Sequence, residues 1–400
     1  MQIFKSHSLL ILYHFIFSIL IYGVIKTSGT EYIKELSVFY VCLLLTYFTS
    51  YYLLIKNKFD INFKVKSINL NKWISILPLT SILLILLHLI YLGDFHAISA
   101  LKLSSITEVV QLRRSITSES NYLVNYIASF NIKGLLPFTL LALLILKKKK
   151  LYWVLFALGS FYVFCLMQKS FIIVLLAPSL IYSLLKFKWF YLIKYIAVIT
   201  AVMVSLVLIH NPEINKPKSP TKQLVQPKNE QINKKQNSTF KTILIGLENR
   251  ILVVPGKTVT GWFNHIPKDL PYQNGTGYRF AQIITKKEYS NYAKELYPIM
   301  YPKYAARGLK GNVNVASFMY DYANFGWKGF IISGISMGLL FIFIEWLFID
   351  RLILKLSINT IPVFLLSSQA ITTALFSGGW GLMLMLYFLF RKREIFNNAK

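Results

Sequence analysis

The 400-residue sequence has little acid, little cysteine and none of the short motifs of nucleotide-driven or metal-dependent enzymes. Asp and Glu number 16 against 44 Lys and Arg, and there are two cysteines. Both cysteines, Cys42 and Cys165, lie inside apolar runs, which favours small buried side chains over a disulfide or a metal pair. The sequence contains no glycine-rich phosphate loop, His/Glu metal motif or nucleophile elbow. It therefore predicts no metal and no cofactor, and the missing ATP-binding motif argues against a pump with its own nucleotide domain.

What the sequence has instead is a series of long apolar blocks. Hydrophobic residues make up 55% of the chain and the mean hydropathy is +0.51, which is far too apolar for a soluble domain of this size. A helix needs about 20 apolar residues to cross the hydrocarbon core of a bilayer. Eight blocks cover residues 9–25, 36–55, 73–92, 126–146, 151–167, 171–185, 190–209 and 329–349, and a ninth at 354–390 has room for one span or two short ones. The sequence therefore predicts an all-α fold, a polytopic transmembrane helical bundle of about ten spans.

Positive charge lies in every second connection between these blocks. Short loops rich in Lys and Arg stay cytoplasmic. The connections after the first and third blocks are balanced or acidic by contrast. We therefore expect a cytoplasmic N-terminus and a tail that returns to the cytoplasm after ten spans; nine is the alternative, because three glycines shorten the last apolar stretch. The basic residues are Lys56, Lys58, Lys64, Lys66 and Lys72, then Lys147 to Lys150, Lys186 and Lys188, Arg351 and Lys355, and Arg391 to Arg393; the glycines are Gly378, Gly379 and Gly381.

This pattern sets the expected organisation of the chain. Residues 1–210 hold seven spans with an outward loop at 93–125, residues 211–325 form a large external loop, and residues 326–400 hold the last spans and the tail. Most of the formal charge of +28 belongs to the cytoplasmic anchors. A lipid bilayer is therefore the predicted partner of these cations, and nucleic acid is not.

The large outward loop has two parts of different composition. Residues 211–241 are polar and proline-rich, which is typical of a disordered tether. Residues 242–325 are rich in Tyr and contain Arg250, Arg279 and Arg307. Aromatic faces stack on sugar rings, and a guanidinium fork binds phosphate through two parallel hydrogen bonds. The alternative is an aromatic belt at the membrane interface with snorkelling cations.

The smaller outward loop contains a predicted surface helix. Ser105 followed by Glu108 forms a capping box, and the apolar residues after it share one face. Arg113 and Arg114 close this helix, where they either complement the helix dipole or bind an anion.

Three polar sites fall within or between the apolar blocks. Lys133 and Lys169 are predicted near outward ends of spans, where their ammonium groups can snorkel or bind substrate. For His88, in the middle of the third block, we favour a neutral, hydrogen-bonded residue inside the bundle.

The approach to the eighth span carries the sharpest resemblance to a known family. Residues 311–322 read Gly-Asn-Val-Asn-Val-Ala-Ser-Phe-Met-Tyr-Asp-Tyr, and Phe325-Gly-Trp-Lys-Gly329 follows. The chain resembles the Wzy-type repeat-unit polymerases of O-antigen and capsule assembly, in which such a start leads through a short helix to a Gly-x-x-Gly entry. Asn314 is expected to cap the short helix, and Gly326 and Gly329 are expected to permit close packing. Arg250 and Gly261 also fit an Arg, ten residues, Gly spacing of some members.

The resemblance implies a glycosyltransferase in the bacterial cytoplasmic membrane. It would transfer a glycan from polyprenyl pyrophosphate to a sugar hydroxyl of a second lipid-linked repeat unit at the outer leaflet, with a chain-length regulator and a flippase as possible partners. The expected general base is His265, Asp269, Asp321 or Glu248, and two loops are expected to close over one pyrophosphate. The expected substrate-binding residues are Arg113, Arg114, Arg250, Arg279, Arg307, Lys169 and Asn314.

Three other classes stay open at this point. An O-antigen ligase differs only in its acceptor, but ligases carry a His before the Asn of the entry motif, where this chain has Val313. A transferase that uses polyprenyl monophosphate sugars would place acids in the first outward loop, where Glu31 and Glu35 lie. A flippase would lack a structured outward domain.

Overall fold

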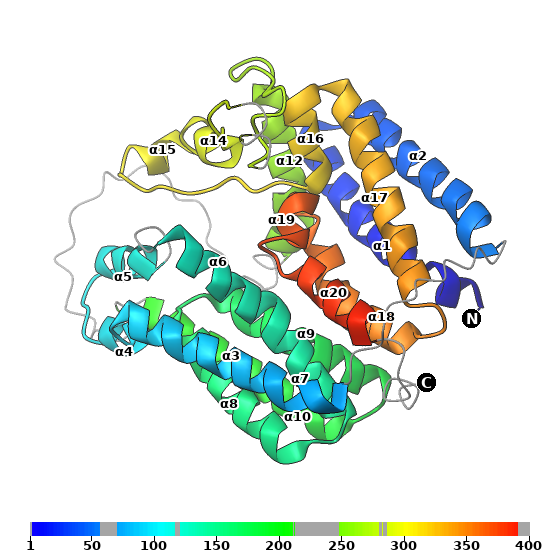
Figure 1. Ribbon diagram of the computed structural model, residues 1–400. Coiled ribbons are helices and arrows are strands. Elements are labelled where there is room, and N and C mark those ends of the chain that lie inside the picture. The colour runs from blue at the N-terminus through cyan, green and yellow to red at the C-terminus, as the bar shows by residue number, and fades with distance from the viewer. Residues whose placement is uncertain are drawn as a thin grey trace, which may run out of the picture. The chain divides into compact units, whose positions relative to one another are not determined.

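A computed structural model describes residues 2–56, 70–116, 121–210, 212, 248–279, 282 and 286–390 of the chain (Figure 1). All regular elements in these ranges are helices, which confirms the all-α prediction for the described part. Apart from Pro212, the predicted tether at 211–241 lies outside the described residues, as do Lys58, Lys64, Lys66 and the basic tail. Two compact units make up the chain. Unit 1 comprises Met1–Lys64, Asn237–Leu352 and Pro362–Ala374, and unit 2 comprises Val65–Gln236, Ile353–Ile361 and Leu375–Lys400.

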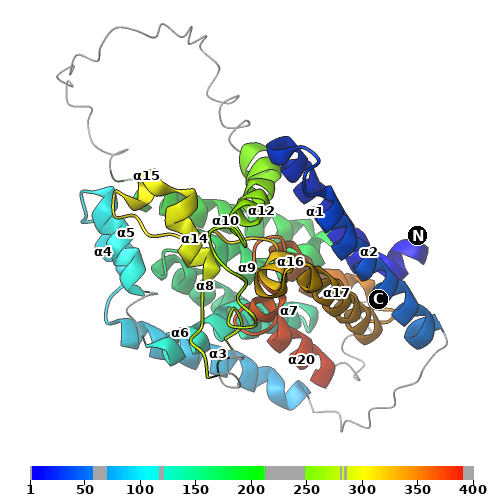
Figure 2. The same ribbon diagram turned by 90° about the horizontal axis from the view of Figure 1, so that it is seen from above.

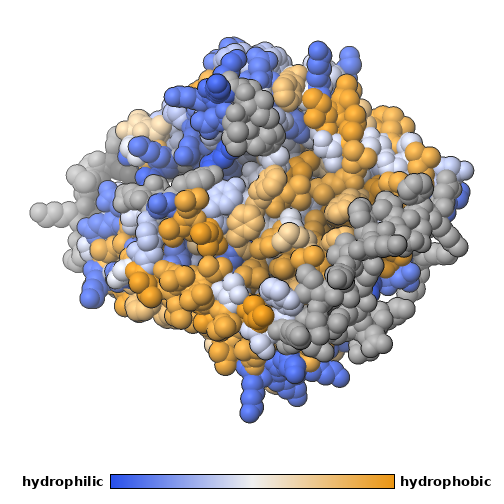
Figure 3. Space-filling view, viewed as in Figure 1, coloured by the Kyte–Doolittle hydropathy of each residue, from blue (hydrophilic) through white to orange (hydrophobic). Residues whose placement is uncertain are grey.

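Six helices in the described part are long and apolar enough to cross a membrane, where about ten spans were predicted. They are Lys5–Ser28, Ile33–Lys56, Ser75–Leu92, Leu123–Ile145, Trp189–His210 and Trp327–Leu347. Three further apolar helices are shorter, at Lys169–Leu185, Leu352–Leu365 and Trp380–Phe390. Apolar side chains gather on the exposed surface over α17 in unit 1 and over α3 in unit 2 (Figure 3). Several apolar helices with exposed apolar faces indicate a membrane protein.

Unit 1 is built around two long helix pairs. Its helices are α1 (Gln2–Ser28), α2 (Ile33–Ser50), α12 (Val254–His265), α14 (Tyr292–Met300), α15 (Pro302–Ala305), α16 (Ser317–Phe325) and α17 (Trp327–Leu347), with most of α19 (Ile371–Leu375). Glycines bring the pairs together. Gly334 and Gly338 of α17 lie against the backbone of α2, and Gly256 of α12 lies against Gly23 of α1. This small-residue spacing lets helix backbones approach closely, which supports packing where no hydrophobic driving force acts between helices.

A cluster of aromatic rings fills the centre of unit 1. Phe17 of α1, Phe39 of α2, Phe318 of α16, and Phe330 and Phe341 of α17 are almost completely buried. Neighbouring rings lie in edge and tilted contacts, with 4.6 Å between the ring centroids of Phe39 and Phe318. Such ring pairs are the favoured aromatic geometry and fix the short helix α16 against the long ones.

Helix α1 breaks near its start, and a buried carboxylate fills the gap. His7 has non-helical angles of φ −130° and ψ 26°, so the next turn begins without its normal acceptors. The Leu9 N–H donates instead to the carboxylate of Glu345 in α17 at 3.1 Å, and Glu345 is buried. The hydrogen bond satisfies a helix-start donor that would otherwise be orphaned in an apolar bundle.

Different helix ends lie together at the two ends of unit 1. At one end the Lys5 ammonium lies 3.9 Å from the Asp350 carboxylate, so the beginning of α1 and the end of α17 lie together. At the other end of α1, the Ser28 and Thr260 hydroxyl oxygens are 3.4 Å apart, which brings α12 to that end. Ser28 and α12 therefore lie at the end of α1 opposite to Lys5 and Asp350.

Unit 2 packs its helices around one central helix. Its elements are α3 (Leu70–Leu92), α4 (His96–Ala100), α5 (Ile106–Arg114), α6 (Tyr122–Phe130), the π-helical segment η3 (Asn131–Leu135), α7 (Leu136–Ile145), α8 (Lys149–Cys165), α9 (Lys169–Leu185), α10 (Trp189–His210) and α20 (Trp380–Phe390). Every residue of α7 is buried, as expected for a helix that is apolar on all sides. Tyr152 and Tyr195 bond through their hydroxyl groups and link α8 to α10. The predicted environment of His88 is confirmed, because its ring nitrogen lies 2.5 Å from the Tyr162 hydroxyl and it is buried.

Tight turns at one end of unit 2 join α7 to α8 and α9 to α10. Lys147 and Phe187 both adopt positive φ, and the next residue in each case donates its N–H to the carbonyl five residues earlier. This is a Schellman ending, here without the usual glycine. Burial lowers the pKa of Lys188, and the positive charges of Lys147 and Lys186 lower it further, so the two basic connections lie at the same end. Their predicted placement on one side is therefore consistent with the fold.

One predicted anchor is not exposed. Lys355 lies in the first turn of α18 (Leu352–Leu365), which contributes residues to both units, next to the connection from α17. Its side chain is buried, so it does not extend into solvent as an anchor would. In unit 2, the buried Trp380 indole N–H donates to the Asn359 amide oxygen at 2.7 Å and fixes α20 to α18.

Candidate functional site

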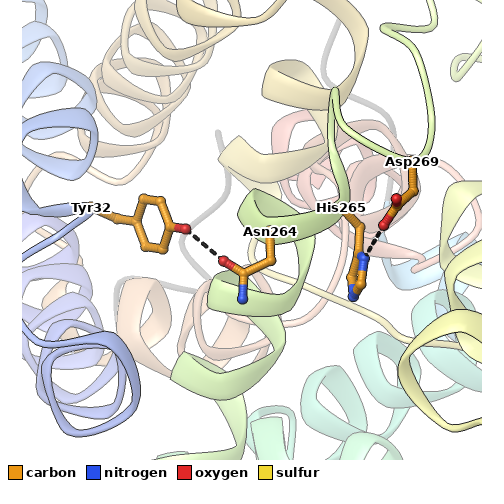
Figure 4. Close-up of polar contacts among 4 residues, drawn as sticks. All are labelled: Tyr32, Asn264, His265 and Asp269. Atoms are coloured by element: carbon orange, nitrogen blue, oxygen red, sulfur yellow. Dashed lines mark hydrogen bonds and ion pairs between the residues drawn. The ribbon is translucent and has the colours of Figure 1, made fainter.

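The end of α12 presents a histidine–carboxylate pair. His265 is the last residue of the helix, and its Nδ1 lies 2.5 Å from Oδ2 of Asp269, one turn further on (Figure 4). A carboxylate only accepts hydrogen bonds, so the Nδ1–H donates and the lone pair lies on Nε2. The two side chains are 26% and 40% exposed, so a substrate can reach them. The structure thus joins two of the predicted catalytic residues into one hydrogen-bonded pair.

The same helix end is fixed from both sides. The preceding residue, Asn264, accepts a hydrogen bond from the Tyr32 hydroxyl at 2.5 Å, on the side of α12 away from Asp269 (Figure 4). The buried Trp262 indole N–H donates to the Val313 carbonyl at 3.1 Å. The Tyr322 hydroxyl donates to the Ile266 carbonyl at 2.9 Å. These hydrogen bonds hold the end of α12, and with it the His265–Asp269 pair, in place.

The third predicted catalytic residue belongs to a different pair. Asp321 lies on α16 and accepts a hydrogen bond from the Tyr278 hydroxyl. Burial raises the pKa of Asp321 to about 6, although the Tyr278 hydrogen bond opposes that rise. Burial and the neighbouring carboxylate likewise raise the pKa of Tyr278. An acid that titrates near neutral pH is suited to proton transfer.

Asn324 shapes the turn that carries Tyr278. Its amide oxygen accepts the N–H groups of Gly275 and Gly277, each at 3.1 Å, and its backbone carbonyl accepts the Asn274 N–H. Asn274 and Gly275 both have positive φ, which a tight turn requires. Sequence reasoning missed Asn324 because its partners lie almost fifty residues away.

The predicted arginines of unit 1 lie on three different elements and are all exposed. Arg250 is in the π-helical segment η5 (Asn249–Val253) before α12. Arg279 lies over the Tyr289 ring, 5.1 Å from its centroid. Arg307 follows α15. Each guanidinium is accessible to a ligand. Arg279 pairs with an aromatic ring, as the composition of residues 242–325 suggested.

The predicted cap of the short helix is wrong. Asn314 is exposed, and the residue before the first turn of α16 is Ala316, which makes no side-chain cap. The chain stays extended for longer because Val313 donates its N–H to the Ala293 carbonyl and Ser317 donates to the Leu366 carbonyl. The predicted close packing at Gly329 is confirmed, since a Cβ there would lie 2.1 Å from the carbonyl oxygen of Asp321.

In unit 2 a second set of predicted residues comes together. The capping box of Ser105 and Glu108 is confirmed, and α5 ends at Arg113 and Arg114. The charges of Arg113 and Lys169 both act on His210, the last residue of α10, so three cationic or ionisable groups from three helices share one region. We call Arg113 and Lys169, which both lie near His210, the cation cluster. Lys169 is also the first residue of α9, where the helix dipole adds partial positive charge.

Of two further residues in this region, Lys133 was considered from the sequence and His210 was not. His210 was missed because it ends the seventh apolar block without any motif around it. Lys133 lies near the middle of the span Leu123–Ile145, rather than near its outward end, and its ammonium lies 5.3 Å from the ring centroid of Phe171 in the first turn of α9. The cation cluster, with the N-terminus of α9, is suited to an anion such as a phosphate or pyrophosphate.

The expectation that both sets of basic residues act on a single pyrophosphate stays a prediction, since they belong to different units. Comparisons with protein-family models, with curated proteins and with solved structures found no match.

Proposed function

We propose that this chain is a membrane glycosyltransferase that polymerises polyprenyl-pyrophosphate-linked oligosaccharide repeat units at the outer face of the bacterial cytoplasmic membrane. The observation that carries the proposal is the accessible His265–Asp269 pair at the end of α12. The resemblance of residues 311–329 to the Wzy-type polymerases supports the same reaction class.

The pair supplies the proton chemistry of such a transfer. The acceptor hydroxyl oxygen attacks the anomeric carbon of the donor glycan, and the bond from that carbon to the pyrophosphate oxygen breaks. Polyprenyl pyrophosphate leaves with the electron pair, and the acceptor proton passes to Nε2 of His265. Asp269 stabilises the resulting imidazolium through Nδ1–H and holds the ring in the required tautomer. Because the donor is already activated, positioning and charge stabilisation supply most of the remaining rate.

Each of the two lipid-linked substrates carries a pyrophosphate, and the basic residues are assigned to these groups. In unit 2 the cation cluster contributes Arg113 and Lys169 beside His210. In unit 1 the exposed Arg250, Arg279 and Arg307 offer further phosphate contacts. Arginine is the residue of choice here because its planar fork matches two phosphate oxygens at once.

The proposed topology has ten spans with the N-terminus in the cytoplasm. The six long apolar helices and the three shorter ones supply nine apolar segments, and α8 supplies a tenth of 17 residues. The ends of unit 1 fit this topology, since Lys5 and Asp350 lie at the end of α1 opposite to Ser28 and α12.

The test is polymer formation by membranes that contain the chain and purified lipid-linked repeat units. Wild-type membranes should give a ladder of products, and His265→Gln should slow its formation by about 10²- to 10⁴-fold. Asp269→Asn should slow it less, because Nε2 remains while the carboxylate is lost. His14→Gln is the matched control, since His14 is an exposed histidine of unit 1 that also contacts a tyrosine, Tyr40.

Three outcomes would move the assignment. A wild-type ladder from His265→Gln would remove His265 as the base. If a strain that lacks the chain still makes polymer of normal length and loses only its attachment to the final acceptor, the chain is a ligase. If lipid-linked repeat units accumulate on the cytoplasmic face of the membrane in that strain, the chain is a flippase.

A further inference from the structure

A row of tyrosines lies on α14 and α15, outside the acid–base pair. The ring centroids of Tyr297 and Tyr301 are 5.6 Å apart, and those of Tyr301 and Tyr304 are 6.4 Å apart. Their spacing of four and then three residues places them on one side of the chain as it passes from one helix to the next. Tyr304 is 52% exposed and the other two are partly exposed, so the row forms a surface and not a core.

The row is held in place by close backbone contacts. Gly311 lies so near Tyr297 that a Cβ at that position would meet the ring at 2.3 Å. Pro298 and Pro302 each follow a tyrosine of the row and restrict the backbone there. A surface that is rigid before a ligand arrives loses little entropy on binding.

The row is also fixed to the helix that carries the acid–base pair. The Met300 side chain fills the space beside Gly261 of α12, where a Cβ would lie 2.0 Å from the methionine methyl carbon. Gly261 is one turn before His265, so α14 packs on the same face of α12 that presents the imidazole. In both Figure 1 and Figure 2, α14 and α15 lie on the side of α12 opposite to α1 and α2.

The charges around the row are mostly positive. Lys303, Arg307 and Lys310 follow or interrupt the tyrosines and are exposed. The acid of α14, Glu295, is turned to the start of that helix, where its carboxylate accepts from the Ser290 hydroxyl at 2.9 Å and from the Asn291 N–H at 3.0 Å. The row therefore offers aromatic faces and edges with a cationic rim.

We propose that Tyr297, Tyr301 and Tyr304 form a platform for consecutive sugar rings of an acidic glycan, with Arg307 and the neighbouring lysines binding its carboxylates. The proposal rests on the proposed function, of which it names the substrate class. The C–H faces of sugar rings pack on aromatic rings, and an amphipathic tyrosine is suited to a ligand that is partly apolar and partly hydroxylated. The cationic rim selects acidic over neutral glycans by charge complementarity.

The experiment measures binding without turnover. The full chain is placed in nanodiscs of zwitterionic lipid and titrated with oligogalacturonate or with a neutral maltooligosaccharide of equal length. Wild type should bind the acidic oligosaccharide more tightly, and its affinity should fall as salt is raised. The double change Tyr301→Ala and Tyr304→Ala should weaken binding about tenfold. Tyr304→Phe should bind like wild type, and Arg307→Gln should reduce the preference for the acidic chain.

The controls separate this proposal from folding and from the proposed function. Tyr52→Ala removes an equally exposed tyrosine of unit 1 from the π-helical segment η1 (Tyr51–Lys56) and should not change binding. His265→Gln should slow polymer formation by about 10²- to 10⁴-fold yet bind the oligosaccharide normally. If wild type binds the oligosaccharide but forms no polymer, the proposed function is wrong while the platform stands.

Two results would overturn the platform. If wild type and the double variant both elute as folded protein and bind the acidic oligosaccharide with equal affinity, the tyrosines are not the binding surface. Loss of wild-type binding on addition of anionic lipid to the nanodisc would show that the row contacts lipid headgroups instead.

Discussion

The contact between Gly23 of α1 and Gly256 of α12 should make a single methyl group at Gly256 costly. A Cβ at Gly256 would lie 2.1 Å from the carbonyl carbon of Gly23 and 2.3 Å from the backbone nitrogen of Val24. Both atoms belong to the backbone, so no side chain can rotate away. The two helices would have to part by roughly 1 Å to restore ordinary van der Waals contact in a close-packed interior.

The magnitude follows from two opposing effects. Forcing extra volume into a packed interface costs about 1–3 kcal/mol, and the upper part of that range, about 2–3 kcal/mol, applies here because the contacts are with backbone atoms. Replacing a helical glycine by alanine returns up to about 1 kcal/mol in helix propensity. Gly256→Ala should therefore lose about 1–2 kcal/mol and lower the apparent melting temperature by about 2–8 °C, from a shift of roughly 2–4 °C per kcal/mol in a domain of this size. Because His265 lies on the same helix, a 1 Å displacement should also slow the proposed transfer by as much as about a hundredfold.

The assay is a heat ramp of detergent-purified protein, followed by gel filtration with fluorescence detection. Gly159→Ala is the matched control, since Gly159 is also helical but meets the side chain of Leu136, at 3.1 Å, which can move. That variant should melt at or slightly above the wild-type temperature. Equal melting temperatures for Gly256→Ala and Gly159→Ala would refute the idea that the backbone contact decides the outcome.

Other changes test the remaining features. Asp321 has a raised pKa of about 6, so the folded state binds its proton more readily than the unfolded chain, and stability should rise as pH falls from about 7 to about 5; a melting series in which Asp321→Asn keeps the wild-type slope would contradict this. Asn324→Leu should leave two N–H groups unbonded and cost about 2–4 kcal/mol in a denaturation series, whereas Asn324→Asp should cost less because it keeps the acceptor oxygen. Arg250→Lys and Arg113→Lys should each slow polymer formation about ten- to a hundredfold in stably inserted protein, and wild-type rates from both would remove these residues from the site. Lys149→Cys should escape an impermeant thiol reagent in intact cells; labelling there would invert the proposed topology.

The sequence predicted those features that local rules determine. Apolar runs predicted the helices, and the Ser105–Glu108 box predicted where α5 begins. The His265–Asp269 pair was within reach as well, because both residues were candidates and a spacing of four brings them together at a helix end.

Features that depend on distant contacts were missed or placed wrongly. Asn314 would cap α16 in isolation, but bonds to Ala293 and Leu366 keep the chain extended and delay the helix to Ser317. The spacing also gave no sign of Asn324, since its two N–H partners come from another segment. Tertiary hydrogen bonds override local propensity at such positions.

The number of spans shows a further limit of counting apolar residues. The helices before the tight turns of unit 2 end at Ile145 and Leu185, and the turns that follow place Lys147 and Phe187, not glycines, at positive φ. The apolar blocks still placed these helix ends to within two residues, but α8 and α9 are each only 17 residues long, which is less than the about 20 residues of a full span.

The hydrogen bond from Leu9 to Glu345 has a consequence for biosynthesis. The donor and the acceptor are 336 residues apart, so α1 is made and inserted long before its partner exists. At ribosomal rates of about 5–20 residues per second, that interval is on the order of tens of seconds. The continuous stretch Val65–Gln236 of unit 2 is synthesised within that interval. Unit 1 is completed later, because α17, which packs on α1 and α2, is synthesised only after it. A nascent chain halted before α17 should therefore leave α2 without the helix that packs on it, while most of unit 2 has already been made.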